Sequence, residues 1–343
     1  MKAKDVIALQ EWLSNPINIT ILTHYNPDGD ALGASLALSM YLQQMGHKVS
    51  VIVPNSYPEY LAWMPQCNQI FIATEQLDEC ETILQQANII FCLDFNAFNR
   101  IGILEKFVSK LKTFKVLIDH HIDPKPYFDI IYSLTNETSS TSELIYFFIS
   151  EKMGDKKRIT KEIAECLYVG IMTDTGSLSY SCNNPSTYMA VSALVNFKID
   201  VEQIHRRVYD TFSNDRIRLL GYCLSERLQV LEEYATSFIF LTKEDLKRFN
   251  YQQGDTEGIV NYGLSIKTVR FTAFFTERDD RIRISFRSKG DFDVNIFARD
   301  HFNGGGHRNA SGGNSYEDMP TTIEKFINLL KQYKTILNLP WDK

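Results

Sequence analysis

The sequence predicts an α/β protein with two domains, and three features of the chain support this fold class. Its 343 residues exceed the roughly 250–300 residues at which a single hydrophobic core stops growing. The first part alternates uninterrupted apolar runs with segments of helical spacing, which is typical of a mostly parallel sheet flanked by helices. The last part has alternating strands followed by helices, which predicts a smaller C-terminal α/β domain. We expect a first domain over residues 1–190, a helical connector over residues 191–233 and a second domain over residues 234–343.

Short runs of apolar and β-branched residues predict the buried strands of the first domain. They cover residues 17–23, 48–53, 88–93 and 114–118. Helical spacing marks residues 31–45, which end at Gly46, and residues 77–86. The pattern is helical and nearly unbroken from residue 184 to residue 233, so we predict that the first domain continues there into the connector.

The second domain begins with two segments that predict strands, at residues 235–241 and 266–275. Residues 281–287 alternate strictly between polar and apolar side chains, so one face of this strand is solvated or faces a cleft. Helices are predicted over residues 293–302 and 321–334. Three consecutive glycines stand between them.

The composition favours a small anionic ligand over a long nucleic acid. Lys plus Arg number 36 against 42 Asp plus Glu, a net charge of −6, whereas a long nucleic-acid-binding surface carries a basic surplus. No apolar run approaches the ~18 residues that span a membrane. The amphipathic N-terminal segment contains acidic residues, unlike a signal peptide, and the six cysteines form no C-x-x-C pair. We therefore expect a cytoplasmic protein without membrane association.

Polar residues follow three of the predicted strands at the point where each strand ends. His24, Asp94 and Asp119 each come directly after a buried apolar run. Ligands bind at the carboxyl ends of strands in open α/β sheets, so we expect these side chains to belong to one site. An aspartate that ends a strand is also a common turn cap, which is the usual explanation of a single such residue.

The loop after the first strand adds two carboxylates to this group. His24, Asp28 and Asp30 stand just before a helix, and Pro27 and Gly29 shape a tight turn. One imidazole and two carboxylates form a hard ligand set that suits Mn²⁺, Mg²⁺ or Fe²⁺ better than structural zinc. Taken alone, the segment is equally compatible with an Asx-rich loop that caps a helix.

Two further clusters make coincidence a poor explanation. Asp119, His120 and His121 follow the fourth strand, and adjacent side chains of an extended chain point in opposite directions. One histidine can therefore ligate a metal while the other meets a substrate. Asp174 lies at the end of a predicted helix that begins near Thr160.

In this order and at this spacing, the motifs resemble those of the DHH phosphoesterase superfamily. The segment from Gly304 to Gly312 is similar to the glycine-rich signature of the associated C-terminal domain, DHHA1, and Arg287-Ser288 to its Arg-Ser segment. The resemblance covers almost the whole chain. It is strongest to the group of bifunctional oligoribonucleases (nanoRNases) that also act as phosphatases on 3′-phosphoadenosine 5′-phosphate, abbreviated pAp below.

The resemblance implies a catalytic DHH domain that holds two divalent metal ions, with Mn²⁺ as the expected metal. Such a pair can share a hydroxide and clamp an in-line displacement at phosphorus. Asp119 would not bind a metal ion itself but would orient the residues that do, and His121 would contact the scissile phosphate. The implied ligands are His24 and Asp28 for one ion, Asp30, His120 and Asp174 for the other, and Asp94 as the bridge.

For the second domain the resemblance implies substrate binding. Arginine can fork onto a phosphate, glycines let the backbone approach an anion closely, and histidine can donate to a terminal phosphate. A surface salt bridge and a simple turn are the structural alternatives for the arginine and the glycines. The implied residues are Arg287, Ser288, Gly304, Gly305, Gly306 and His307.

Two other positions bear on the substrate. Arg100, six residues after Asp94, either faces phosphate or forms an ordinary ion pair. Where the group would carry a pair of an aromatic residue and arginine, this chain has Leu178 and Ser179. That departure leaves the choice of substrate open without affecting the metal ligands.

The preferred function is metal-dependent hydrolysis of very short RNA, including linear dinucleotides such as pGpG and pApA, and of the 3′-phosphate of pAp to give AMP. The alternatives are an inorganic pyrophosphatase or exopolyphosphatase of the same superfamily, an exonuclease for long strands like RecJ, and a non-catalytic nucleotide-binding module. The expected partners are thus short oligoribonucleotides and phosphorylated nucleotides, not long duplexes. Whether the chain forms a homodimer stays open.

Overall fold

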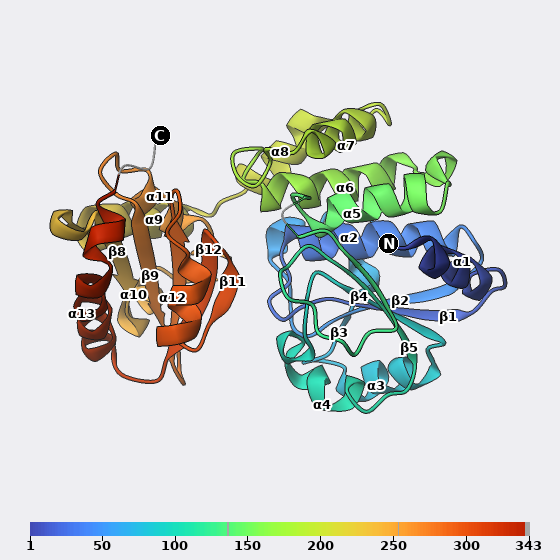
Figure 1. The fold of residues 1–343 in the computed structure, drawn as a ribbon, viewed down its shortest axis with the longest axis horizontal. Helices are drawn as coiled ribbons and strands as arrows, with labels where there is room; N and C mark the ends of the chain where they lie inside the picture. The colour runs from blue at the N-terminus through green and yellow to red at the C-terminus, as the bar shows by residue number, and fades with distance from the viewer. Residues whose placement is uncertain (136, 253, 340–343) are drawn as a thin grey trace. The chain divides into compact units, whose positions relative to one another are not determined.

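The structure, a computed structural model, describes residues 1–135, 137–252 and 254–339. The chain divides into two compact units, Met1–Thr211 and Phe212–Lys343. A parallel sheet flanked by helices forms the first unit, and a smaller mixed sheet with its own helices forms the second (Figure 1). This architecture confirms the predicted fold class.

The sheet of the first unit has six parallel strands in the order β3-β2-β1-β4-β5-β6. The strands are β1 (Asn18–Leu22), β2 (Lys48–Val53), β3 (Phe71–Ile72), β4 (Ile89–Leu93), β5 (Phe114–Asp119) and β6 (Ile130–Ser133). All four predicted strands are present. The two strands that the sequence did not predict are short strands at the edges of the sheet, where few apolar residues are needed. The strand order reverses between β1 and β4, which makes this the switch point of the sheet.

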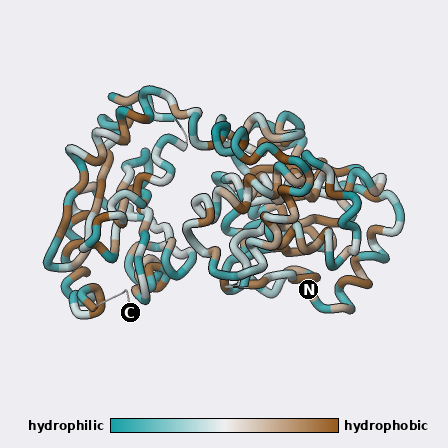
Figure 2. Tube along the Cα trace, turned by 90° about the horizontal axis from the view of Figure 1, so that it is seen from above, coloured by the Kyte–Doolittle hydropathy of each residue, from teal (hydrophilic) through white to brown (hydrophobic). Residues whose placement is uncertain are grey.

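Helices cover both faces of this sheet (Figure 1). One face packs against α2 (Gly29–Gln43), α5 (Thr141–Phe147) and α6 (Lys161–Asp174), and the other against α3 (Leu77–Gln86) and α4 (Glu105–Val108). The remaining helices of the unit are α1 (Ala3–Trp12), α7 (Pro185–Val195) and α8 (Val201–Tyr209). Hydrophobic stretches of the chain run through the interior of this unit (Figure 2).

Helices α2 and α6 touch through glycines. A Cβ atom at Gly33 would overlap the main-chain oxygen of Cys166 on α6, and one at Gly170 would lie 2.8 Å from Oδ1 of Asp30 on α2. The absence of side chains at both glycines therefore lets the two helices approach closely. This contact fixes the first turn of α2 relative to the last turn of α6, which carry Asp30 and Asp174.

The sheet of the second unit has the order β11-β12-β10-β9-β8-β7, and its pairs are antiparallel except β8 with β9. The strands are β7 (Gln229–Leu231), β8 (Thr236–Leu241), β9 (Phe271–Glu277), β10 (Ile282–Ser288), β11 (Gly305–His307) and β12 (Ala310–Ser315). One face carries a phenylalanine-rich core under α12 (Val294–His301) and α13 (Met319–Leu337). The other face packs over β8 and β9 against α9 (Asn214–Tyr222), α10 (Lys243–Arg248) and α11 (Ile259–Leu264).

Two local predictions differ from the structure. The helical pattern expected up to residue 233 ends earlier, because residues 229–231 form the edge strand β7. The strand predicted over residues 266–275 begins only at Phe271. Two of the three glycines belong to strand β11, which pairs with β12, so the alternative of a simple turn does not hold for them. Among the described residues, no helix combines the length and the apolar character that crossing a membrane requires.

Candidate functional site

The predicted metal ligands converge at the carboxyl edge of the parallel sheet, at the switch point between β1 and β4. His24 lies beyond the end of β1, and Asp94 follows β4 directly. Asp119 ends β5, and His120 comes next in the chain. Three strand ends thus deliver side chains to one place, as expected for neighbouring parallel strands, and helices α2 and α6 add Asp28, Asp30 and Asp174.

Asp94 is the centre of this cluster. Its Oδ2 lies 3.2 Å from Nε2 of His24, and its Oδ1 lies 3.4 Å from Nε2 of His120. His24 Nε2 is also 3.9 Å from Oδ1 of Asp28, and His120 Nε2 is 3.6 Å from Oδ2 of Asp174.

Two of the groups of closely spaced donor atoms found here overlap at Asp94. Ligand atoms of His24, Asp28 and Asp94 lie within 4.8 Å of one another, and so do those of Asp30, Asp94 and His120. Asp94 belongs to both groups. This is the arrangement of two neighbouring cation positions that share one carboxylate.

The backbone at Asp94 explains how its carboxylate reaches this position. Its φ of 63° lies in the left-handed region, which aspartate and asparagine adopt more readily than most residues. The chain therefore turns sharply at the end of β4. The hydroxyl of Thr141 donates to Asp94 Oδ1 at 2.9 Å and helps to hold it.

Helix α5 anchors a second ligand, Asp30. The main-chain N–H of Thr141 donates to Asp30 Oδ2 at 2.7 Å, and that of Ser142 donates to Asp30 Oδ1 at 2.7 Å. The sequence analysis missed these two residues. A signal was present, because Ser140 caps the helix by accepting from the N–H of Glu143, and a serine followed three residues later by glutamate is a recognised helix start.

Asp119 contacts His121 instead of the expected ligands. Its Oδ1 lies 2.7 Å from Nδ1 of His121, which is the kind of contact that fixes the orientation of an imidazole ring. Asp119 is fully buried, and its Oδ2 has no hydrogen-bond partner among the residues that the structure describes. The carboxylate therefore holds the imidazole in one orientation.

The site concentrates negative charge in a buried place. Burial, reinforced by repulsion from Asp94 and Asp174, raises the pKa of Asp30 well above its ordinary value. Burial also opposes ionisation of Asp94, but hydrogen bonds to His120 and His24 outweigh it and hold the pKa of Asp94 well below its usual range. Although burial lowers it, the pKa of His120 rises to about 10 because of the carboxylates of Asp174 and Asp94.

These residues fit divalent cations. The donors are carboxylate oxygens and imidazole nitrogens, a set that suits Mn²⁺ or Mg²⁺ better than thiophilic metals. The like charges of Asp30, Asp94 and Asp174 act on one another in a buried site, which a bound cation would relieve. The chemistry of the cluster thus agrees with a metal centre.

Arg100 lies close to the same cluster. Burial and then the positive charge of Arg100 lower the pKa of His121, while at His24 burial and the same charge only oppose the rise in pKa that Asp94 and Asp28 cause. Arg100 forms none of the ion pairs found within the described residues. Leu178 and Ser179, in contrast, lie in the turn that follows α6.

The second unit brings only some of its predicted residues together. Arg287 on β10 is in register with Ala310 on β12, which is in register with His307 on β11. Arg287 and His307 are thus two strands apart in one row, on the order of 10 Å between backbones. The hydroxyl of Ser288 donates to the main-chain oxygen of Phe292, in the buried layer on the other side of the sheet.

Close contacts or an unusual backbone conformation require glycine at two positions next to this row. A Cβ atom at Gly304 would overlap the main chain of Gly312, and Gly306 adopts a φ of 151°. The N–H of Gly306 donates to Oδ1 of Asn295 at 2.9 Å. Gly305 lies between them in β11.

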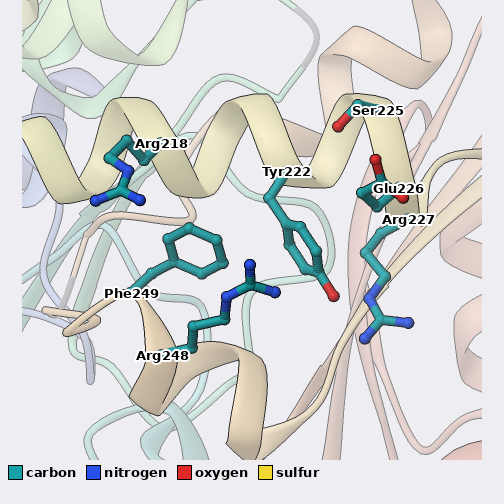
Figure 3. Close-up of a pocket in the computed structure, with 7 residues that line it drawn as sticks. All are labelled: Arg218, Tyr222, Ser225, Glu226, Arg227, Arg248 and Phe249. Atoms are coloured by element: carbon teal, nitrogen blue, oxygen red, sulfur yellow. The ribbon is translucent and has the colours of Figure 1, made fainter.

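A separate depression of about 650 Å³ in the second unit contains none of the predicted site residues (Figure 3). Arg227 in its wall is paired with Asp245 at 2.9 Å, and the guanidinium of Arg248 lies 5.1 Å from the ring centre of Tyr222. These arginines form contacts between helices of the same unit. The residues that line the depression include no cluster of carboxylates and histidines. It is lined by Arg218, Tyr222, Ser225, Glu226, Arg227, Arg248 and Phe249.

Fold and site together define a phosphoesterase of the DHH class. Residues 18–171 match the DHH family, N-terminal domain, and residues 232–335 match the DHHA1 domain. The chain belongs to the DHH family, which confirms the resemblance found in the sequence.

Curated relatives agree with this assignment. The chain is 29% identical over 301 residues to the bifunctional oligoribonuclease and PAP phosphatase NrnA of Bacillus subtilis (strain 168), covering 87% of this chain and 89% of the relative. It is 29% identical over 316 residues to the probable bifunctional oligoribonuclease and PAP phosphatase NrnA of Streptococcus mutans, covering 91% and 95%.

Solved structures share the fold. An exopolyphosphatase-related protein from Bacteroides fragilis superposes with a TM-score of 0.93 at 41% identity, over 98% of each chain. RecJ from Thermus thermophilus has a TM-score of 0.57 at 13% identity, over 98% of this chain and 55% of RecJ. The second likeness concerns the fold alone.

Proposed function

We propose that this phosphoesterase hydrolyses phosphate esters of very short nucleotides. Its substrates are oligoribonucleotides from about dinucleotide size, including pGpG and pApA, and the 3′-phosphate of pAp, which yields AMP. The observation that carries the proposal is the pair of carboxylate–imidazole groups joined through Asp94. The names of the two curated relatives support the choice of substrates.

In this proposal the two groups hold two divalent cations, with Mn²⁺ preferred. When bound, such a pair lowers the pKa of water and neutralises charge that develops at phosphorus. Asp94 would be shared between the two cations. The other ligands would be His24 and Asp28 at one position and Asp30, His120 and Asp174 at the other.

Protein side chains would position the phosphate. His121, oriented by Asp119 through Nδ1, would contact the scissile phosphate and stabilise charge on a phosphate oxygen. Arg100 would neutralise part of the same charge. Asp119 acts through His121, so it is a positioning residue.

The C-terminal unit would bind the rest of the substrate. Arg287 and His307 stand in one row of the sheet, at a separation that lets both side chains reach one phosphate. The backbone of Gly304, Gly305 and Gly306 offers a surface without side chains for an anion. Ser288 would support Arg287 through the backbone, since its hydroxyl is engaged with Phe292.

A second candidate is hydrolysis of phosphoanhydrides in polyphosphate. The name of the Bacteroides fragilis relative, an exopolyphosphatase-related protein, favours it. Both candidates use the same cluster, so only a comparison of substrates can separate them.

A panel of initial rates would test the two candidate functions, with pAp, RNA of two to five nucleotides, pGpG, pyrophosphate, polyphosphate and longer RNA as substrates. The proposal requires turnover of pAp and short RNA with Mn²⁺ and its loss with chelator. Turnover of polyphosphate alone would contradict it.

Added Mn²⁺ should raise the thermal unfolding midpoint of the protein, because a cation bound to the folded state stabilises it by mass action. Saturation at 100 times the dissociation constant corresponds to about 2.7 kcal/mol. Differential scanning fluorimetry with and without Mn²⁺ measures the shift. The Asp94→Asn variant should lose most of it. An equal shift in wild type and variant would place the cations elsewhere.

Replacement of Arg287 by methionine should raise KM for pAp and short RNA about tenfold and change kcat little. The reason is the loss of one charged hydrogen bond in the bound complex, with the metal ligands intact. Steady-state kinetics on both substrates measures the split. Lys331→Met on α13, an exposed residue on the other side of the sheet, is the charge-matched control. A fall in kcat at unchanged KM would rule out this binding role.

A further inference from the structure

Glu143 is a buried carboxylate that belongs to neither of the two donor groups joined through Asp94. Its Oε2 accepts from the main-chain N–H of Ser139 at 2.9 Å, from the hydroxyl of Ser139 at 2.7 Å and from that of Thr187 at 2.8 Å. Its Oε1 accepts from the hydroxyl of Ser186 at 2.6 Å. Both oxygens are therefore held by hydrogen bonds, and the side chain is fixed in one position.

These hydrogen bonds join two segments that lie far apart in the chain. Glu143 belongs to the first turn of α5, and Ser139 stands just before this helix. Ser186 and Thr187 belong to the first turn of α7. Glu143 thus ties the start of α5 to the start of α7.

The same turn of α5 holds two of the predicted metal ligands. Thr141 donates its N–H to Asp30 and its hydroxyl to Asp94, and the N–H of Ser142 donates to Asp30. Thr141 and Ser142 are fully buried and immediately precede Glu143. The main chain that presents these donors is therefore the segment that Glu143 fixes.

A carboxylate is an energetically costly residue at this position. Burial of an ion is unfavourable unless hydrogen bonds offset it, and an apolar side chain of similar volume often gives equal or greater stability. The carboxylate adds direction, because hydrogen bonds of 2.6–2.9 Å define the position of the turn more narrowly than apolar contacts do. A displaced turn would carry the donors to Asp30 and Asp94 with it.

We propose that Glu143 is a positioning residue for the metal centre. By holding the first turn of α5 against α7, it keeps Asp30 and Asp94 where two cations require them. This inference rests on the proposed function, to which the metal centre belongs. It goes further, because it assigns a role in metal binding to a residue outside both donor groups.

The test measures Mn²⁺ binding to the metal-free full chain by isothermal titration calorimetry in wild type, Glu143→Met and Glu143→Gln. Methionine matches the length of the side chain but accepts none of the hydrogen bonds, so the dissociation constant should rise about tenfold, the lower end for residues that orient metal ligands. Glutamine can keep them, because its oxygen replaces Oε2 and its amide group donates to Ser186 in place of Oε1. Glu143→Gln should therefore bind Mn²⁺ within about twofold of wild type.

Asp245→Leu is the matched control. Asp245 is likewise a buried carboxylate in the first turn of a helix, α10. It accepts from the hydroxyl of Tyr222, from Arg227 and from the main-chain N–H of Thr242, but it lies in the second unit. Its variant should lower the unfolding midpoint of the metal-free protein and bind Mn²⁺ as wild type does. The same result for Glu143→Met would show a structural role alone and contradict the proposal.

A variant on α7 keeps the test decisive if Glu143→Met does not fold. Ser186→Ala combined with Thr187→Val removes two donors and leaves α5 unchanged, so it should weaken Mn²⁺ binding about fivefold. Wild-type affinity in this double variant overturns the proposal. An equal loss of affinity in Glu143→Gln and Glu143→Met also overturns it, because the charge would then act instead of the hydrogen bonds.

The wild-type titration separates this inference from the proposed function. If wild type binds Mn²⁺ and the variants bind it equally well, only the role of Glu143 fails. If wild type binds no Mn²⁺, the metal centre and the proposed function fail together with it.

Discussion

Replacement of Asp94 by asparagine should lower the rate of pAp and dinucleotide hydrolysis by on the order of a thousandfold or more. This is at the upper end of the effect of removing one charged stabiliser from a reaction centre, about 4 kcal/mol. The reason is that Asp94 belongs to both donor groups, so one substitution weakens both proposed cation positions. Asparagine keeps the shape of the side chain and tolerates the left-handed φ of 63°.

The matched control is Asp123→Asn. Asp123 is another aspartate with a left-handed φ, 61°, but it lies outside both donor groups and pairs with Lys125. Its variant should retain the wild-type rate. Circular dichroism and the unfolding midpoint without metal establish that both variants are folded. A rate for Asp94→Asn within a few-fold of wild type would refute the assignment of the site.

Replacement of Gly33 by alanine should destabilise the first unit by about 3 kcal/mol, the upper range for overpacking a core. The added Cβ would meet the main-chain oxygen of Cys166, which cannot rotate away as a side chain would. Helices α2 and α6 must then move apart, and with them Asp30 and Asp174. We expect the unfolding midpoint to fall by roughly 6–12 °C for a unit of this size, together with a loss of activity.

Gly221→Ala is the corresponding control. Gly221 lies in α9, and no atom stands within 4 Å of the position its Cβ would take. Alanine is favoured over glycine in helices by about 1 kcal/mol, so this variant should be unchanged or slightly more stable. If Gly33→Ala behaves in the same way, close packing of the two helices is not what sets the distance between their carboxylates.

The sequence predicted the central strands and the cluster at their ends for one physical reason. Parallel strands that are buried on both faces appear in the sequence as continuous apolar runs. A polar residue directly after such a run must lie at the carboxyl ends of the strands. His24, Asp94 and Asp119 could therefore be placed together from the order of residues alone. The edge strands β3 and β6 could not, because partly exposed strands lack that continuous run.

The hydrogen bonds within the site were not predictable in the same way. That Asp119 contacts His121, and that the start of α5 holds Asp30, depends on loops and helix positions set by tertiary packing. Ser288 shows the same limit, because the alternation of β10 assigns it to the buried face although it directly follows Arg287. A motif identifies neighbours in the chain, whereas the pleat of the strand decides which of them share a surface.

The anchoring of Asp30 has a consequence for metal selection. Two main-chain N–H groups bind one carboxylate oxygen each, so the side chain has lost its rotational freedom before any cation arrives. The entropic cost of arranging this ligand is met during folding, and the site is preorganised on that side. A position fixed at both oxygens discriminates between ions by radius. Asp28 differs, because its two main-chain donors, the N–H groups of Asp30 and Ala31, both bind Oδ1, which leaves Oδ2 of this partly exposed side chain more room to adjust. The two proposed cation positions should therefore differ in selectivity, and the position at Asp30 should accept a narrower range of ionic radii.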